Sequence, residues 1–123
     1  MWIAMNDSFL SVVQDRNDPD GAVVRARVRD DLHNVFDTDD TEANVIESND
    51  SDYRFRVFVP KAVVAEIISS LINQIDYDNF KNSVEDDFRH DAYIDIWRAM
   101  NKVQVDLYGH QTYKWYENLD KMN

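Results

Sequence analysis

The chain contains no cysteine, which excludes disulfide bonds and zinc sites built on thiolates. It has only two glycines, Gly21 and Gly109, so it cannot form a glycine-rich loop that cradles phosphate. It also lacks a Gly-x-Ser-x-Gly motif, the turn that presents a nucleophilic serine. These absences argue against a nucleotide-cofactor fold and against nucleophilic catalysis. We therefore expect a binding protein rather than an enzyme, with no catalytic residues, no cofactor and no metal.

Long apolar segments are missing as well. No apolar run approaches the roughly 20 residues that a helix needs to span a bilayer. Residues 1–9 have neither a basic start nor a cleavage site, so we expect no signal peptide. Together with the absence of cysteine, this predicts a cytoplasmic protein, located in the host cytoplasm if a phage encodes it.

Basic residues are few relative to acidic ones. The 13 lysines and arginines face 24 aspartates and glutamates, which gives a formal net charge of −11. Such a chain repels nucleic acid and anionic membranes over most of its surface and attracts basic partners. Apolar residues still make up 44% of the 123 residues, enough for a single core. We predict one domain over residues 1–123, with an aromatic C-terminal extension at 105–123.

The hydrophobic pattern predicts an α+β fold. We expect one or two strands in residues 1–13, a turn at 16–21, a strand at 22–29 and a short helix at 29–36. Short and long strands follow at 45–46 and 53–59, and Pro60 precedes an apolar helix at 63–75. Asp76 or Asp78 is expected to cap a short helix, and Asp86 and Asp87 to begin a longer one. This order predicts an antiparallel four-stranded sheet with helices packed on one face, ferredoxin-like in permuted order, plus C-terminal helices.

Five segments carry a family resemblance: an N-terminal MW, VRARVRDDL, DYRFRVFVPKAVVAEI, IDYDNFK and RHDAYIDIWRAM. In residue order they resemble a small, functionally uncharacterised protein family of bacteria and phages. The resemblance covers roughly residues 1–104, and the chain departs from the family pattern after Val103. It implies no particular activity.

Acidic residues are concentrated in the middle of the chain. Nine carboxylates and no lysine or arginine lie between Asp30 and Asp52. Carboxylates can imitate phosphates toward the arginines of a partner, so we expect this segment to bind a basic, nucleic-acid-binding protein. A phage protein could use it to inhibit a defence complex such as CRISPR. A solvated loop is the structural alternative. The predicted contact residues are Asp37, Asp39, Asp40, Glu42, Glu47, Asp50 and Asp52.

Arginines at alternate positions of two predicted strands offer a different site. If the strands pair, Arg25, Arg27, Arg54 and Arg56 share one sheet face with Phe58 beside them. That face could bind a ligand phosphate or single-stranded RNA, with the aromatic ring available for stacking. Alternatively, cross-strand acids such as Glu47 neutralise the arginines.

Two further features have simpler explanations. Asp86 and His90, or Asp87 with His90 or Asp91, share a helical face. Two carboxylates and an imidazole could hold a divalent ion there, but acids are also favoured in a first helical turn. In the C-terminal tail, Trp115, Leu119 and Met122 can share a helical face. This face could pack within the domain or form a homodimer.

Overall fold

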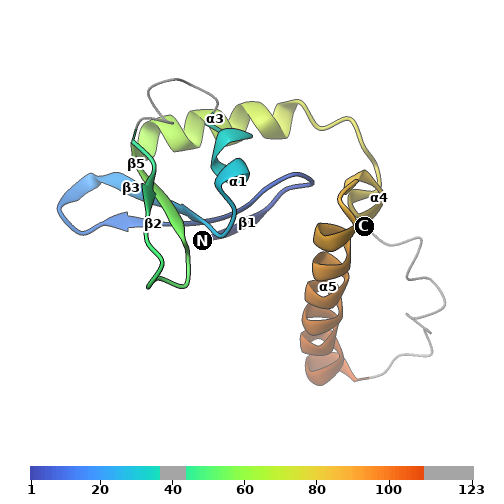
Figure 1. The fold of residues 1–123 in the computed structure, drawn as a ribbon. Coiled ribbons are helices and arrows are strands. Elements are labelled where there is room, and N and C mark those ends of the chain that lie inside the picture. The colour runs from blue at the N-terminus through green and yellow to red at the C-terminus, as the bar shows by residue number, and fades with distance from the viewer. Residues whose placement is uncertain (37–43, 110–123) are drawn as a thin grey trace. The chain divides into compact units, whose positions relative to one another are not determined.

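The computed structural model describes residues 1–36 and 44–109 (Figure 1). The chain divides into two compact units, Met1–Ile75 and Asp76–Asn123. That residues 1–123 form one domain stays a prediction.

The first unit is built on an antiparallel sheet. Its strands are β1 (Trp2–Ala4), β2 (Phe9–Asp15), β3 (Asp18–Ala26), β4 (Ile46–Glu47) and β5 (Phe55–Pro60). The described residues place them in the order β1-β2-β3-β5-β4, and every neighbouring pair is antiparallel. The prediction of an α+β fold with an antiparallel sheet is confirmed, with five strands instead of four.

The strand order also bears out the permuted ferredoxin-like arrangement. Without β1, the four remaining strands lie in the order β2-β3-β5-β4, so that β5 inserts between β3 and β4. A ferredoxin-like sheet has this order when its last strand is moved to the front. β1 extends the sheet at the free side of β2.

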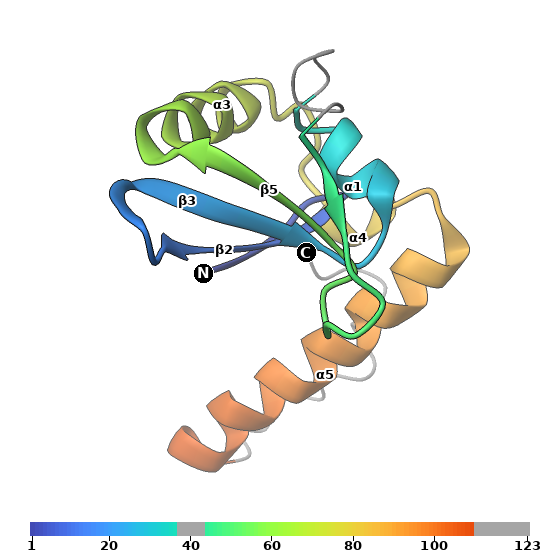
Figure 2. The same ribbon diagram turned by 60° about the vertical axis from the view of Figure 1, so that its left-hand side comes forward.

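The two helices that the structure describes in the first unit lie on the same face of the sheet (Figure 2). They are α1 (Arg29–His33) and α3 (Lys61–Asn73), and Pro60 immediately precedes the latter. Alternate residues of β2, β3 and β5 meet one side of each helix, because strand side chains alternate between the two faces. The buried core consists of Leu10, Ala22, Val24, Ala26, Leu32, Phe36, Phe55, Val57 and Val64.

The predicted turn at 16–21 is wrong in extent. Asp15 pairs with Asp18, so only Arg16 and Asn17 form the tip of the β2–β3 hairpin. Gly21 therefore lies inside β3, and its φ is not positive. A side chain at Gly21 would place its Cβ 3.0 Å from Asp18 Oδ2, so close packing explains the glycine better than a left-handed backbone does.

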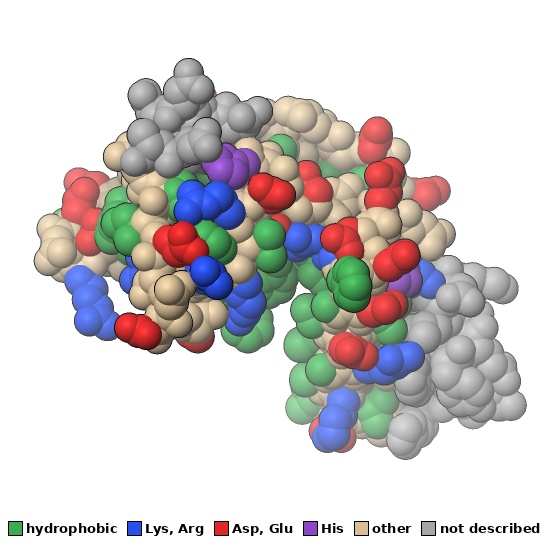
Figure 3. All heavy atoms as spheres, in the orientation of Figure 1, with side chains coloured by type: hydrophobic (Ala, Val, Ile, Leu, Met, Phe, Trp, Pro, Cys, Tyr) green, Lys and Arg blue, Asp and Glu red, His purple; other side chains and the backbone are tan. Residues whose placement is uncertain are grey.

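The second unit contains α4 (Phe80–Ser83) and α5 (Asp87–Tyr108). Asn79 caps α4, in place of the predicted Asp76 or Asp78, because its Oδ1 accepts a hydrogen bond from the Asn82 backbone (3.0 Å). The rings of Phe80 and Tyr93 stack at 5.6 Å and join the two helices. Hydrophobic side chains remain exposed along α5 (Figure 3): Phe88, Ile96, Met100, Val103, Leu107 and Tyr108.

No helix among the described residues is long and apolar enough to cross a membrane.

Candidate anion-binding face of the sheet

The face of the sheet opposite α1 and α3 carries a row of residues that runs across all five strands. The strand register aligns Trp2 with Ser11, Ser11 with Arg25, Arg25 with Arg56, and Arg56 with Ile46. The next row places Val13, Val23 and Phe58 side by side. We call this surface the arginine face and define it by Trp2, Ser11, Arg25, Arg27, Tyr53, Arg56 and Phe58.

Tyr53 organises two of the arginines. The guanidinium carbons of Arg25 and Arg27 lie 4.6 Å and 4.3 Å from the centre of its ring. Tyr53 itself is only 4% exposed, so the ring supports the two cations and is not open to a ligand. Arg27 also lies 5.9 Å from the ring of Phe9. These contacts fix both guanidinium groups without neutralising their charge.

Serine hydroxyls fix the central arginines from the side. Arg25 Nη2 donates to Ser11 Oγ, and Arg56 Nη2 donates to Ser51 Oγ, each at 2.8 Å. The Nε atoms of Arg25 and Arg56 are buried and have no hydrogen-bond partner. A buried donor without a partner costs free energy, which a bound acceptor or an ordered water would offset.

No carboxylate balances this part of the sheet. Among residues 1–36 and 44–109, the ion pairs within 4 Å involve other basic residues, and none involves Arg25, Arg27 or Arg56. Arg25 and Arg56 are nevertheless direct cross-strand neighbours, an arrangement in which like charges destabilise a sheet. In a chain with 24 acidic residues, this unpaired positive charge makes the arginine face a candidate site for an anion.

Exposed aromatic rings flank the guanidinium groups. Trp2 is 72% exposed and Phe58 is 49% exposed. Both lie on the sheet face that the helices do not cover. The rings of Trp2 and Phe9 are 6.0 Å apart. Planar groups of a ligand could therefore stack on aromatic rings while its anionic groups contact arginine.

Arg54 does not join the arginine face. Its Nε donates to Glu47 Oε1 at 2.8 Å, and Arg29 Nη2 approaches Glu47 Oε2 at 3.4 Å. The hydrogen bond from Arg54 and the charges of Arg54 and Arg29 hold the pKa of Glu47 below its usual range. Figure 3 shows basic and acidic side chains next to one another over the hairpin that carries β4 and β5. Three of the four predicted arginines thus share a face, and the fourth is neutralised by Glu47.

The predicted acidic contact surface is largely outside the described residues. Asp37, Asp39, Asp40 and Glu42 fall within residues 37–43, which the structure does not describe. Glu47 forms ion pairs with Arg54 and Arg29. Asp50 and Asp52 are exposed in the segment between β4 and β5. A continuous acidic surface therefore stays a prediction.

The acids at the start of α5 have a structural role. Asp86 Oδ1 accepts hydrogen bonds from the backbone of Phe88 (2.8 Å) and Arg89 (3.3 Å), which caps the helix. His90 Nδ1 lies 3.8 Å from Asp91 Oδ1. Across the described parts of the chain, no three histidine, aspartate or glutamate side chains are grouped so that they could hold a metal ion.

Sequence reasoning missed Tyr53, Trp2 and the serines. The predicted strand at 53–59 included Tyr53, but β5 begins only at Phe55, and the Tyr53 ring contacts Arg25 and Arg27. Trp2 and Ser11 could be assigned to the arginine face only from the strand register, which a single sequence does not give. Phe58 was predicted beside the arginines, and the register confirms that position.

The arrangement can bind and orient an anion that carries planar groups. No model of a known protein family matches the chain, and no curated protein or solved structure matches it. The resemblance to a bacterial and phage family stays a prediction.

Proposed function

We propose that the first unit is a binding module that takes single-stranded RNA on the arginine face. The observation that carries this proposal is the cross-strand pair of Arg25 and Arg56, held by serine hydroxyls and left without a carboxylate. Single-stranded RNA offers both phosphates for guanidinium groups and unstacked bases for exposed rings such as Trp2 and Phe58. The proposed site of action is the cytoplasm.

The net charge of −11 limits this interaction without preventing it. Charges separated by more than about 8 Å are largely screened at physiological ionic strength, whereas phosphates in direct contact with arginine are not. The acidic remainder of the chain therefore slows and weakens the approach of RNA over long distances. We expect modest affinity and selection of flexible single strands, whose bases can reach the rings.

Fluorescence anisotropy with a labelled oligouridine tests the proposal. The variant carrying both Arg25→Gln and Arg56→Gln should lose affinity by about tenfold or more, since each charge-assisted hydrogen bond contributes about 1.5–3 kcal/mol. Arg98→Gln is the matched control because Arg98 is exposed and pairs with Asp95 on α5. The slope of log affinity against log salt should fall by about 1.4 in the double variant, at about 0.7 per lost phosphate contact on a single strand.

Two results would reject the RNA-binding proposal. One is the absence of saturable binding to single strands at about 50 mM salt, where electrostatic affinity is enhanced. The other is an equal loss in Arg98→Gln and in the double variant. Capture of a basic protein that depends on Asp50 and Asp52, and not on the arginines, would support the acidic contact surface instead.

A further inference from the structure

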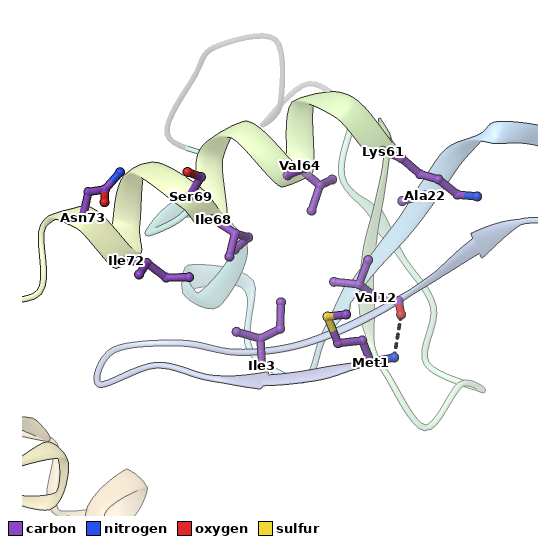
Figure 4. Close-up of a pocket in the computed structure, with 11 residues that line it drawn as sticks. Met1, Ile3, Val12, Ala22, Lys61, Val64, Ile68, Ser69, Ile72 and Asn73 are labelled. Atoms are coloured by element: carbon purple, nitrogen blue, oxygen red, sulfur yellow. Dashed lines mark hydrogen bonds between the residues drawn. The ribbon is translucent and has the colours of Figure 1, made fainter.

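An apolar cavity of about 450 Å³ lies on the other side of the sheet, between the strands and α3. Figure 4 shows Ile3 and Val12 of the sheet pointing toward Val64, Ile68 and Ile72 of α3 across the open space. Eight of its eleven lining residues are apolar. Ile3 and Val12 alternate with Trp2 and Ser11 along their strands, so the cavity and the arginine face are separate sites.

The cavity has the size of a small-molecule site, which is typically about 300–1,000 Å³. A water molecule occupies about 30 Å³ in the liquid, so this space has room for many water molecules. Its mostly apolar wall offers few hydrogen-bond partners for them. Ile72 is 60% exposed at one end of it. Covering these side chains with an apolar ligand would remove hydrocarbon surface from water, the main source of affinity in apolar pockets.

The cavity lining carries one charged side chain. This is Lys61, with Ser69 and Asn73 as the polar remainder, and the ammonium group of Met1 donates to Val12 O at 2.8 Å. Lys61 Nζ donates to Pro19 O at 2.7 Å and to Gln14 Oε1 at 3.1 Å. An ammonium group has three donors, so one donor and the whole positive charge are left for an anion. Among the described residues, no carboxylate lies within ion-pair distance of Lys61.

The length of the site matches an extended acyl chain. Lys61 and Asn73 lie at opposite ends of α3, about 18 Å apart along the helix axis. Ile68 and Ile72 are one turn apart and provide a continuous hydrocarbon surface between those ends. We infer that this cavity binds a free fatty acid, with its hydrocarbon chain along α3 and its carboxylate at Lys61.

Calorimetric titration of the full chain with dodecanoate, below the concentration at which it forms micelles, tests this inference. Dodecanoate should bind saturably at one site per chain. Lys61→Gln should weaken dodecanoate about tenfold or more, because a charge-assisted hydrogen bond is lost, and should change the affinity for dodecanol less than twofold. The titrations use about 0.15 M salt, which screens the nearby acids of the β2–β3 hairpin.

Ile72→Glu should abolish binding of both probes because it places a carboxylate beside the acyl chain. Ile96→Glu on α5 is the matched control, since Ile96 is 44% exposed and lies in the second unit. If Ile72→Glu lowers the unfolding temperature, the comparison of dodecanoate with dodecanol in Lys61→Gln decides the question alone.

Three outcomes would overturn the inference. They are the absence of saturable dodecanoate binding, equal effects of Ile72→Glu and Ile96→Glu, and equal weakening of dodecanoate and dodecanol by Lys61→Gln. Association only with phosphatidylglycerol vesicles, and not with free dodecanoate, would also overturn it in favour of a membrane surface.

Discussion

Arg25 and Arg56 stand directly opposite each other on neighbouring antiparallel strands, and among the described residues neither has an acidic partner. Each is held by a serine hydroxyl at 2.8 Å, so the two guanidinium groups cannot simply turn away from one another. The unbound protein therefore holds two positive charges close together, and their repulsion raises the free energy of the folded state. Such costs are characteristic of binding sites, where the ligand supplies the missing charge.

Because the two guanidinium groups repel each other, removal of one cation should stabilise the free protein. We expect Arg56→Met to raise the unfolding temperature at low ionic strength, by the equivalent of up to about 1 kcal/mol, because it removes a like-charge cross-strand pair and a buried unpaired donor. The gain should shrink as salt screens the repulsion. Thermal unfolding followed by circular dichroism measures both effects.

Arg98→Met is the control for this experiment, since it removes an exposed arginine that has an acidic partner. Lower stability of Arg56→Met than of Arg98→Met at low salt would show that Arg56 stabilises the folded protein instead of destabilising it.

Phe58 should matter for binding more than for stability. It is 49% exposed on the arginine face, and a base stacked on such a ring contributes about 1–3 kcal/mol. Phe58→Ala should therefore weaken RNA binding by that amount in anisotropy titrations. Ile46→Ala is a matched control, because Ile46 is 48% exposed on the same face but cannot stack a base in the same way. Equal losses in the two variants would leave the stacking contact without support.

Asp31 joins α1 to the start of β2. Its side chain is 3% exposed, and Oδ2 accepts a hydrogen bond from the Phe9 backbone at 3.0 Å. Asp31→Ala should lower the free energy of unfolding by about 1–3 kcal/mol, because it leaves a backbone donor without this acceptor. The exposed neighbour Asp30 is the control, and Asp30→Ala should change stability by less than about 0.5 kcal/mol. Urea unfolding compares them, and similar losses would contradict the role of Asp31.

Glu47 should make a pH-dependent contribution to stability. Its pKa in the folded state is lowered by Arg54 and Arg29, so its contribution is present above the pKa of the unfolded chain. It is lost as the pH falls through the lower, folded-state value. Glu47→Gln should therefore reduce the stability difference between about pH 7 and about pH 3, where Glu titrates. Asp50→Asn, at an exposed position in the same hairpin, should reduce it less, and an equal reduction would argue against this ion pair.

Residues close together in the chain determine the local pattern of this protein. The alternation in β3 and β5 placed Val24 and Val57 on the face opposite Arg25 and Arg56, because side chains of a strand alternate with a period of two. The apolar spacing of α3 and the cap of α5 by Asp86 were also readable, since both depend on residues within one or two helical turns.

Strand pairing and helix packing determine which of these residues are in contact. Strand pairing brought Arg25 to Arg56 and aligned Trp2 with both, whereas Glu47 drew Arg54 away from them. The packing of α3 on the sheet created the cavity beside Lys61. These relations join residues far apart in the chain, and their register depends on the summed packing of the whole sheet. Within a regular strand, a local pattern therefore predicts the face on which a side chain lies, but not its partner.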